Sequence, residues 1–198
     1  MAGTLILPAF GFTCTRRTET DQATESIQDE TEIDQAILAY LGCIDFDCSE
    51  KLNDLVALGP DAVEPLVMLL KHGASPDMAG QLTSDITVVR LRSVIALGAL
   101  EDPRALDPLV AAVEDPNPLV RAEIATAIGK FSGEDAALAT LLRMLGDSDP
   151  LVREMTAGAL ERLGNKEALT ALRSAVKSES ADYIRSAINK AIETLEAR

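Results

Sequence analysis

The sequence predicts an all-α fold, a right-handed α-solenoid built from antiparallel helix pairs. Arginines at positions 90, 121, 153 and 185 are separated by 31, 32 and 32 residues, and their neighbours repeat in register. A second segment with helical periodicity precedes each of these copies. The chain is 47% hydrophobic but has only four Phe, two Tyr and no Trp, so Ala, Leu, Ile and Val supply most of its apolar surface. Self-similarity at a fixed period of about 20 to 50 residues is typical of stacked repeats.

Composition excludes several classes of partner. The 198 residues suit one domain with a substantial core. With 32 acidic against 18 basic side chains, the formal net charge is −14, which argues against nucleic-acid binding because Lys and Arg supply most of the affinity for phosphates. The scarcity of aromatic residues also leaves few platforms for base stacking. No stretch approaches the roughly 20 apolar residues of a membrane span, so we expect none.

The first 30 residues are expected to form a flexible acidic tail. Residues 1–14 are apolar, but Arg16 and Arg17 follow this stretch, whereas a secretory signal carries its basic residues before it. The residues before Cys14 match a lipoprotein cleavage site poorly. We therefore expect a cytoplasmic protein. The alternative is an exported or lipid-anchored protein, if the apolar segment is a truncated signal.

The three cysteines, Cys14, Cys43 and Cys48, are too few and too irregular to indicate a disulfide framework. A metal pair at Cys43 and Cys48 would need two further ligands, and the single histidine, His72, is isolated in sequence. We expect a buried thiol at a helix end and a second thiol in a loop, with a metal site or a disulfide as the less favoured alternative. No metal is predicted.

The solenoid is predicted to span residues 31–198. Its first helix, with Ile33, Ile37, Leu38 and Leu41 at helical spacing, would serve as an N-terminal cap. Residues 52–59 would form the second helix of a degenerate unit.

Four full repeats are then expected over 60–100, 103–131, 134–163 and 165–196. Pro118 and Pro150 stand where the first turn of a helix tolerates proline. The loop at 73–84 is longer than its counterparts, and long loops in repeat arrays often carry function, although insertions are also well tolerated.

The repeated pattern is Asp-x-x-x-x-Val-Arg-x-x-Ala-x-x-Ala-(Leu/Ile)-Gly, most complete at residues 115–129. It resembles the short class of HEAT-like repeats that occurs in phycobilin lyase subunits and in bacterial scaffold proteins. The resemblance covers residues 52–196 and implies an armadillo-type superhelix. The signatures of ankyrin and tetratricopeptide repeats are absent.

This resemblance also implies a structural role for the repeated arginines. In HEAT repeats, an acid at the turn between two helices and an arginine early in the second helix form a ladder that links neighbouring units. The expected pairs, each six residues apart, are Asp115 with Arg121, Asp147 with Arg153, and Glu179 with Arg185. Arg90 departs from the pattern, because Ser84 stands six residues before it and Asp85 five. We favour a structural ladder over a substrate site.

The residues needed for catalysis are not apparent. A single histidine excludes the His-based di-iron cage of the HEAT-like deoxyhypusine hydroxylases, and no Gly-rich phosphate loop occurs. The HEAT-like DNA glycosylases use a basic, aromatic-lined face that this composition contradicts. We therefore predict no enzymatic activity, no catalytic residue and no cofactor. A bilin pigment is a less favoured ligand, because no cluster of His or aromatic residues offers it a pocket.

Stacked helix pairs leave a concave face lined by the second helices. Relative to the ladder arginine, offsets −1, +3 and +7 give Val120, Ile124 and Ile128 and are predicted to be core. Offsets +2, +5 and +9 should face the groove. The groove residues predicted to bind a partner are Arg92, Ile95, Glu123, Thr126, Lys130, Met155, Arg162 and Lys190. Ala99, Gly158, Ala187 and Thr194 complete the same offsets.

No chemistry repeats from unit to unit along this groove, so a regular polymer is not the expected ligand. The favoured function is a scaffold or adaptor that binds a protein partner along the concave face. The alternative, which rests on the family resemblance alone, is a subunit or chaperone of a bilin lyase-type enzyme.

Overall fold

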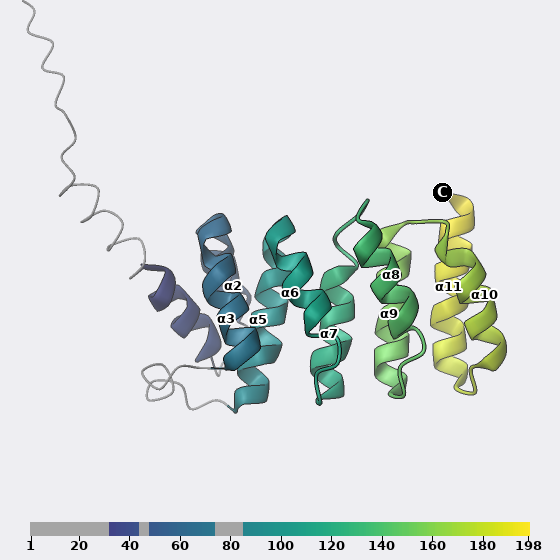
Figure 1. Cartoon of the computed structure of the whole chain (residues 1–198), viewed down its shortest axis with the longest axis horizontal. Coiled ribbons are helices and arrows are strands. Elements are labelled where there is room, and N and C mark those ends of the chain that lie inside the picture. The colour runs from purple at the N-terminus through teal and green to yellow at the C-terminus, as the bar shows by residue number, and fades with distance from the viewer. Residues whose placement is uncertain (1–31, 44–47, 74–84) are drawn as a thin grey trace, which may run out of the picture. The chain divides into compact units, whose positions relative to one another are not determined.

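The computed structural model describes residues 32–43, 48–73 and 85–198, of which Ile33–Arg198 form one compact unit. Every regular element in these ranges is helical, and the helices follow one another in antiparallel pairs (Figure 1). The predicted all-α solenoid is therefore confirmed. The predicted tail at 1–30 and most of the long loop at 73–84 lie outside the described residues.

A helix at residues 32–41, here called the cap helix, precedes the pairs. The elements that follow are α2 (Ser49–Ala57), η1 (Gly59–Ala62), α3 (Val63–His72), α5 (Ile86–Leu100), η2 (Pro103–Ala105), α6 (Leu106–Ala111), α7 (Pro118–Ile128), α8 (Asp135–Met144), α9 (Pro150–Leu163), α10 (Ala168–Ser178) and α11 (Asp182–Ala197).

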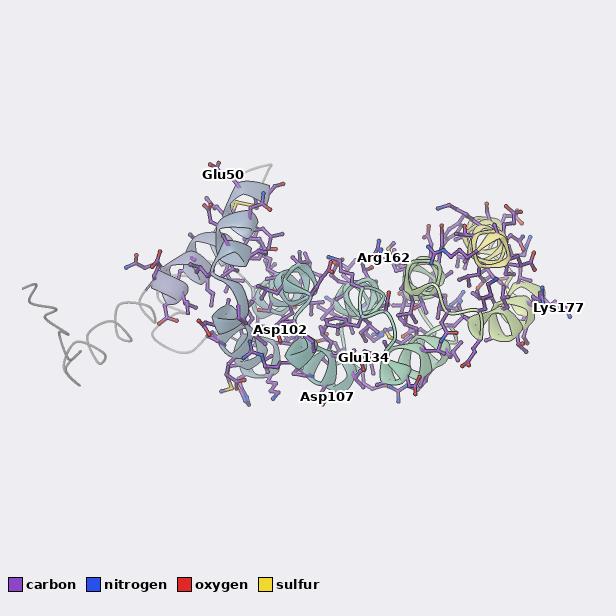
Figure 2. All side chains as sticks on the ribbon, turned by 90° about the horizontal axis from the view of Figure 1, so that it is seen from above. Glu50, Asp102, Asp107, Glu134, Arg162 and Lys177 are labelled. Carbon is purple, nitrogen blue, oxygen red and sulfur yellow. A yellow bond between two sulfur atoms is a disulfide. The ribbon has the colours of Figure 1, made fainter. Side chains whose placement is uncertain are left out.

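The helices form two layers. The second helices of the pairs, α5, α7, α9 and α11, pack side by side on one face, and α3, α6, α8 and α10 cover the other (Figure 2). Close packing within the first layer depends on small residues. A Cβ atom on Gly129 would lie 2.8 Å from both Cα and Cβ of Ala159, and one on Gly98 would lie 2.8 Å from Cβ of Ala127. Glycine opposite alanine therefore allows neighbouring second helices to approach closely.

Three of the second helices, α5, α7 and α9, begin at a residue whose side chain caps them. The side chains of Asp85, Asn117 and Asp149 accept hydrogen bonds from the backbone N–H two residues later, at 2.8 to 2.9 Å. Pro118 and Pro150 occupy the first helical position, where no N–H partner is required. Local sequence thus determines where these helices start.

The core is almost entirely aliphatic. Val120, Ile124 and Ile128 are fully buried, which confirms the assignment of offsets −1, +3 and +7 to the core. At offset +3 the neighbouring helices carry Ser93 and Thr156, both fully buried. Their hydroxyl groups donate to the backbone carbonyl four residues earlier, at 2.8 and 2.7 Å, so neither buried oxygen lacks a partner.

The cap helix and α2 are joined by a disulfide between Cys43 and Cys48. Their Cα atoms lie 6.1 Å apart, within the range that a disulfide can bridge. The expectation of two separate thiols is therefore wrong. Cys43 follows the end of one helix and Cys48 precedes the start of the next.

Candidate protein-interaction face

The repeated arginines form ion pairs with carboxylates of the following unit. Arg90 Nε lies 2.8 Å from Asp115 Oδ2. Arg121 Nε lies 2.9 Å from Asp147 Oδ2, and Arg153 Nε lies 2.7 Å from Glu179 Oε2. The second helix of one unit is thereby tied to the inter-helix turn of the next.

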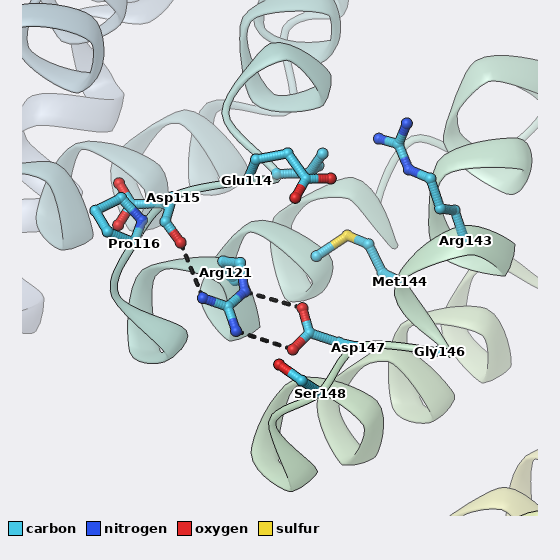
Figure 3. Close-up of a pocket in the computed structure, with 10 residues that line it drawn as sticks. Glu114, Asp115, Pro116, Arg121, Arg143, Met144, Gly146, Asp147 and Ser148 are labelled. Atoms are coloured by element: carbon cyan, nitrogen blue, oxygen red, sulfur yellow. Dashed lines mark hydrogen bonds and ion pairs between the residues drawn. The ribbon is translucent and has the colours of Figure 1, made fainter.

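The predicted pairing six residues apart is therefore wrong for the carboxylates. The acid six residues earlier in the same unit contributes its backbone carbonyl oxygen, which accepts a hydrogen bond from the arginine. These bonds join Arg121 to Asp115 at 2.9 Å, Arg153 to Asp147 at 2.9 Å, and Arg185 to Glu179 at 2.8 Å. Figure 3 shows Arg121 held between its two partners.

The two ends of the ladder differ from its middle. Arg90 has no acid six residues before it, yet it pairs with Asp115, because the ion pair depends on the following unit. Arg185 is the last repeated arginine, and its guanidinium pairs instead with Asp182 of its own helix.

Each ladder carboxylate also organises its own turn. Asp115 and Asp147 each accept a 2.8 Å hydrogen bond from the backbone N–H two residues later. Glu179 accepts from the N–H groups of Ser180 and Ala181 at 2.9 and 3.0 Å. The hydrogen bond from Arg121 lowers the pKa of Asp147, and the hydrogen bond from Arg153 lowers the pKa of Glu179 to about 2. Asp147 and Glu179 therefore remain charged at neutral pH.

Clefts of about 450, 420 and 250 Å³ lie beside the ladder arginines and carboxylates, a surface here called the ladder edge. The first is lined by Arg121, Asp147 and Arg143, among others (Figure 3). The ladder groups that line it are already paired with one another, so a ligand would have to compete for them. The ladder edge is for this reason a weaker candidate site than the opposite side of the second helices.

The opposite side of the second helices offers the stronger candidate. Residues spaced i, i+4, i+7 and i+11 share one face of a helix. We call this surface the inner face. Its residues are Val88, Arg92, Ile95 and Ala99 on α5; Leu119, Glu123, Thr126 and Lys130 at α7; Leu151, Met155, Gly158 and Arg162 on α9; and Tyr183, Ala187, Lys190 and Thr194 on α11. Arg162 lies on this side and Lys177 on the other (Figure 2).

Large apolar side chains are exposed on the inner face. Leu119 is 52% exposed, Met155 36% and Tyr183 54%. Met155 is among the predicted groove residues, whereas Leu119 and Tyr183 were missed. They stand two residues before their ladder arginines, one helical turn before offset +2. Extending the groove periodicity by that single turn would have found them.

The cations at the other end of the inner face cap neighbouring helices. Lys130 Nζ donates to the carbonyl of Gly98 at 2.9 Å, in the last turn of α5. Arg162 Nη1 donates to the carbonyl of Thr126 at 3.2 Å, in the last turn of α7. Carbonyls in the last turn of a helix have no partner within it, and a cation there is favourable to the helix dipole.

Arg92 performs the same task for the cap helix. Its guanidinium donates to the carbonyls of Tyr40 at 2.9 Å, Leu41 at 2.6 Å and Cys43 at 2.5 Å, and it lies 5.9 Å from the centre of the Tyr40 ring. The contact of Arg92 with a partner stays a prediction. The donors of Arg92 hold the end of the cap helix against α5.

The remaining predicted groove residues lie between the apolar and cationic ends. Glu123 is half-buried, and burial raises its pKa, an effect that Lys130 and Arg162 partly oppose. Thr126 donates its hydroxyl to the carbonyl of Ala122 at 3.1 Å. Ile95 is half-buried on α5.

On α11, Lys190 lies 3.3 Å from Glu161 and is 73% exposed. Of the predicted groove residues, Met155, Arg162 and Lys190 are thus the most accessible.

Membrane-spanning helices and metal-binding clusters are both absent from the described residues. No helix in the part of the chain that the structure describes is long and apolar enough to cross a membrane. No group of three or more His, Cys, Asp or Glu side chains placed to hold a metal ion occurs in residues 32–43, 48–73 and 85–198.

The repeat geometry agrees with a family comparison. The family model for HEAT repeats matches residues 76–137 and 112–193, which together cover more than half of the chain. The chain belongs to the HEAT-repeat family. This membership accounts for the paired helices and their 32-residue spacing.

Among solved structures, this HEAT-repeat chain is similar to one in the complex of CpcE and CpcF of phycocyanin lyase from Nostoc sp. PCC7120. The identity is 25% and the TM-score 0.65, over 82% of this chain and 98% of that one. An engineered protein matches at 19% identity with a TM-score of 0.45, over 91% of this chain and 94% of that one. A search of curated protein sequences gives no match.

Proposed function

We propose that this HEAT-repeat protein is a non-enzymatic scaffold or adaptor that binds a protein partner along its inner face. The observation that carries the proposal is the exposure of Leu119, Met155 and Tyr183 on three consecutive second helices. Among the described residues, the other exposed large apolar side chains are Met68 and Ile86. Apolar exposure on neighbouring helices favours association with another protein, since burying it removes apolar surface from water.

The similar Nostoc structure supports a protein partner, because it is a complex of two different proteins, CpcE and CpcF. The same similarity keeps a second function under consideration, namely a subunit or chaperone of a bilin lyase-type enzyme. That function predicts that the purified chain, alone or with a partner subunit, changes the visible absorbance of an open-chain tetrapyrrole. An unchanged spectrum in both cases would remove this alternative.

The scaffold function is tested by site-specific photo-crosslinking in cells that naturally express the protein. A photoreactive phenylalanine analogue replaces Leu119 or Tyr183 on the inner face, or Met68 on α3 as the control. We expect the two inner-face probes to yield the same discrete crosslinked protein and the Met68 probe not to yield it. Equal yields from all three positions would overturn the assignment of the inner face.

A matched set of variants then tests the side chains themselves. The triple variant Leu119→Gln, Met155→Gln and Tyr183→Gln should lose the complex, while Met68→Gln should retain it. Because these side chains are exposed, the melting temperature should change little in either variant. Retention of the complex by the triple variant would contradict the proposal.

For location, we propose an oxidising compartment in place of the cytoplasm. The Cys43–Cys48 disulfide supports this choice, because cytosolic thiols are normally kept reduced. Rapid alkylation of intact cells, followed by mass spectrometry, tests it. Protection of both cysteines until a reductant is added is the expected result, and immediate alkylation of both would restore the cytoplasmic assignment.

A further inference from the structure

The charge on the inner face is opposite in sign to that of the whole chain. The chain carries a formal net charge of −14. The sixteen inner-face positions nevertheless hold four cations, Arg92, Lys130, Arg162 and Lys190, against the single carboxylate of Glu123. An acidic molecule thus has a positively charged strip on the surface where its apolar side chains are exposed.

The bonding of Lys130 and Arg162 preserves their charge, whereas Lys190 pairs with Glu161 at 3.3 Å. Ladder arginines such as Arg121 are neutralised by carboxylates at hydrogen-bond distance. Lys130 and Arg162 instead donate to backbone carbonyls, which carry no net charge. The carboxylate nearest Lys130 is the exposed Glu101 at 3.8 Å, a distance and exposure at which solvent screens the pair. The inner face therefore attracts anionic groups.

The apolar and cationic groups form two rows that cross the second helices. Leu119 and Lys130 are eleven residues apart at α7, whereas Met155 and Arg162 on α9, and Tyr183 and Lys190 on α11, are seven apart. At a rise of 1.5 Å per residue, the two rows are about 16 Å apart at α7 and about 10 Å apart on α9 and α11. Successive members of each row are about 10 Å apart, the usual distance between packed helices. An α-helix with side chains is about 10–12 Å wide, so one helix laid across α9 and α11 would contact both rows there.

We propose, on the basis of the function proposed above, that the inner face binds an acidic amphipathic helix of the partner protein. Apolar residues seven apart on that helix, about 10 Å along its axis, would contact Leu119, Met155 and Tyr183. Carboxylates along the adjacent edge would contact Lys130, Arg162 and Lys190. An extended peptide is narrower and would reach only one of the two rows.

The full-length chain and labelled synthetic helices test this inference by fluorescence anisotropy. One 21-residue peptide carries Leu at every seventh position and Glu along one flank. A second replaces each Glu by Lys, and a third keeps the Glu residues but has a central Pro that breaks the helix. We expect the first peptide to bind at least tenfold more tightly than either of the others, and to weaken as salt is added.

Variants of the protein assign the contacts. Lys130→Gln with Arg162→Gln removes two positive charges and should weaken binding of the acidic helix about tenfold. Glutamine can still donate to the carbonyls that both cations cap, so the fold should be retained. The matched control is Arg143→Gln with Lys177→Gln, two exposed cations on α8 and α10. Lys190→Glu gives an independent test, because the Lys190 side chain is 73% exposed and its head group pairs with the carboxylate of Glu161. Circular dichroism establishes that each variant is folded.

Several outcomes would overturn the inference. Equal binding of the acidic and basic helices, binding of neither, or undiminished binding after the central Pro would each do so. A self-dimer that sedimentation detects and that the inner-face variants abolish would also overturn the inference, because a second copy of this chain would then occupy the inner face. If the helix assay fails while the inner-face crosslinks persist, the proposed function stands and only the identity of the bound element is wrong.

Discussion

Arg121 binds Asp147 through two parallel hydrogen bonds, with Nε and Nη2 each 2.9 Å from a different carboxylate oxygen. The two residues belong to successive units, so this geometry determines how one unit is oriented on the next. Bidentate guanidinium–carboxylate pairs combine strength with directional specificity, as this task requires.

Replacing Arg121 by alanine should destabilise the fold. The Arg121 and Asp147 side chains are only 14% and 13% exposed, so the pair contributes more than a surface ion pair and its loss leaves a carboxylate poorly solvated. We expect the free energy of unfolding to fall by about 2 kcal/mol. The melting temperature should fall by about 4–8 °C. Arg143→Ala, on the exposed surface of α8, is the control and should change little. Strictly additive effects of Arg121→Ala and Asp147→Ala in a double-mutant cycle would contradict this account.

Stability should decrease in acid as the ladder carboxylates take up protons. The pKa of Glu179 is about 2 in the folded chain, below its ordinary value of 4.5, chiefly because of the hydrogen bond from Arg153. A pKa lowered by folding means that the unfolded chain binds more protons in this range. The contribution of Glu179 is therefore complete above about pH 4.5 and is lost as the pH falls toward 2. Carboxyl NMR titration measures this pKa directly. Arg153→Gln should return it toward its ordinary value, and Arg143→Gln should not.

Two glycine substitutions should have opposite effects. A Cβ on Gly129 would meet the Cα, Cβ and carbonyl oxygen of Ala159 at 2.8 to 2.9 Å, so Gly129→Ala forces α7 and α9 apart. We expect a loss of about 1–3 kcal/mol. A Cβ on Gly158 would meet no atom within 4 Å, and Gly158 lies within α9. Gly158→Ala should therefore stabilise by about 0.5–1 kcal/mol. Chemical denaturation of both variants tests the pair, and destabilisation by Gly158→Ala would be inconsistent with the open space described.

Reduction of the disulfide should loosen the cap helix before the rest of the chain. Opening the short loop between Cys43 and Cys48 removes about 2 kcal/mol of stabilisation, most of it felt locally. Hydrogen exchange at residues 32–41 should accelerate on the order of 30-fold, and α7 and α9 should change far less. The double variant Cys43→Ala and Cys48→Ala supplies the control, since reductant should have no further effect on it. Uniform acceleration along the whole chain would argue against a local role.

The all-α fold class could be predicted from the sequence because the pattern that indicates it is periodic. The 32-residue spacing of Arg121, Arg153 and Arg185 predicts the repeat, and the positions of Val120, Ile124 and Ile128 predict the buried side of a helix. Both patterns follow from helix geometry and depend little on distant contacts. The exposed Leu119 belongs to the same periodicity and was missed only because the groove pattern began one turn too late.

Contacts between units were less predictable. The separation of Asp115 and Arg121 along the chain gives no indication that the arginine reaches past its own turn to Asp147. The capping role of Arg92 depends on the cap helix, which lies about fifty residues earlier. The disulfide likewise depends on how the cap helix and α2 are placed relative to each other. A single sequence reports position along a helix, whereas these bonds depend on how separate helices meet.

The dual bonding of each ladder carboxylate has a consequence for how the protein folds. Asp147 accepts from Asp149 N–H within its own turn and from Arg121 of the preceding unit. The same side chain therefore shapes the start of α9 and anchors the neighbouring unit. A unit that unfolds withdraws this carboxylate from its neighbour, so each unit depends on the state of the next. In a one-dimensional array, such nearest-neighbour coupling determines how far unfolding spreads, and here it favours the solenoid melting as one cooperative block.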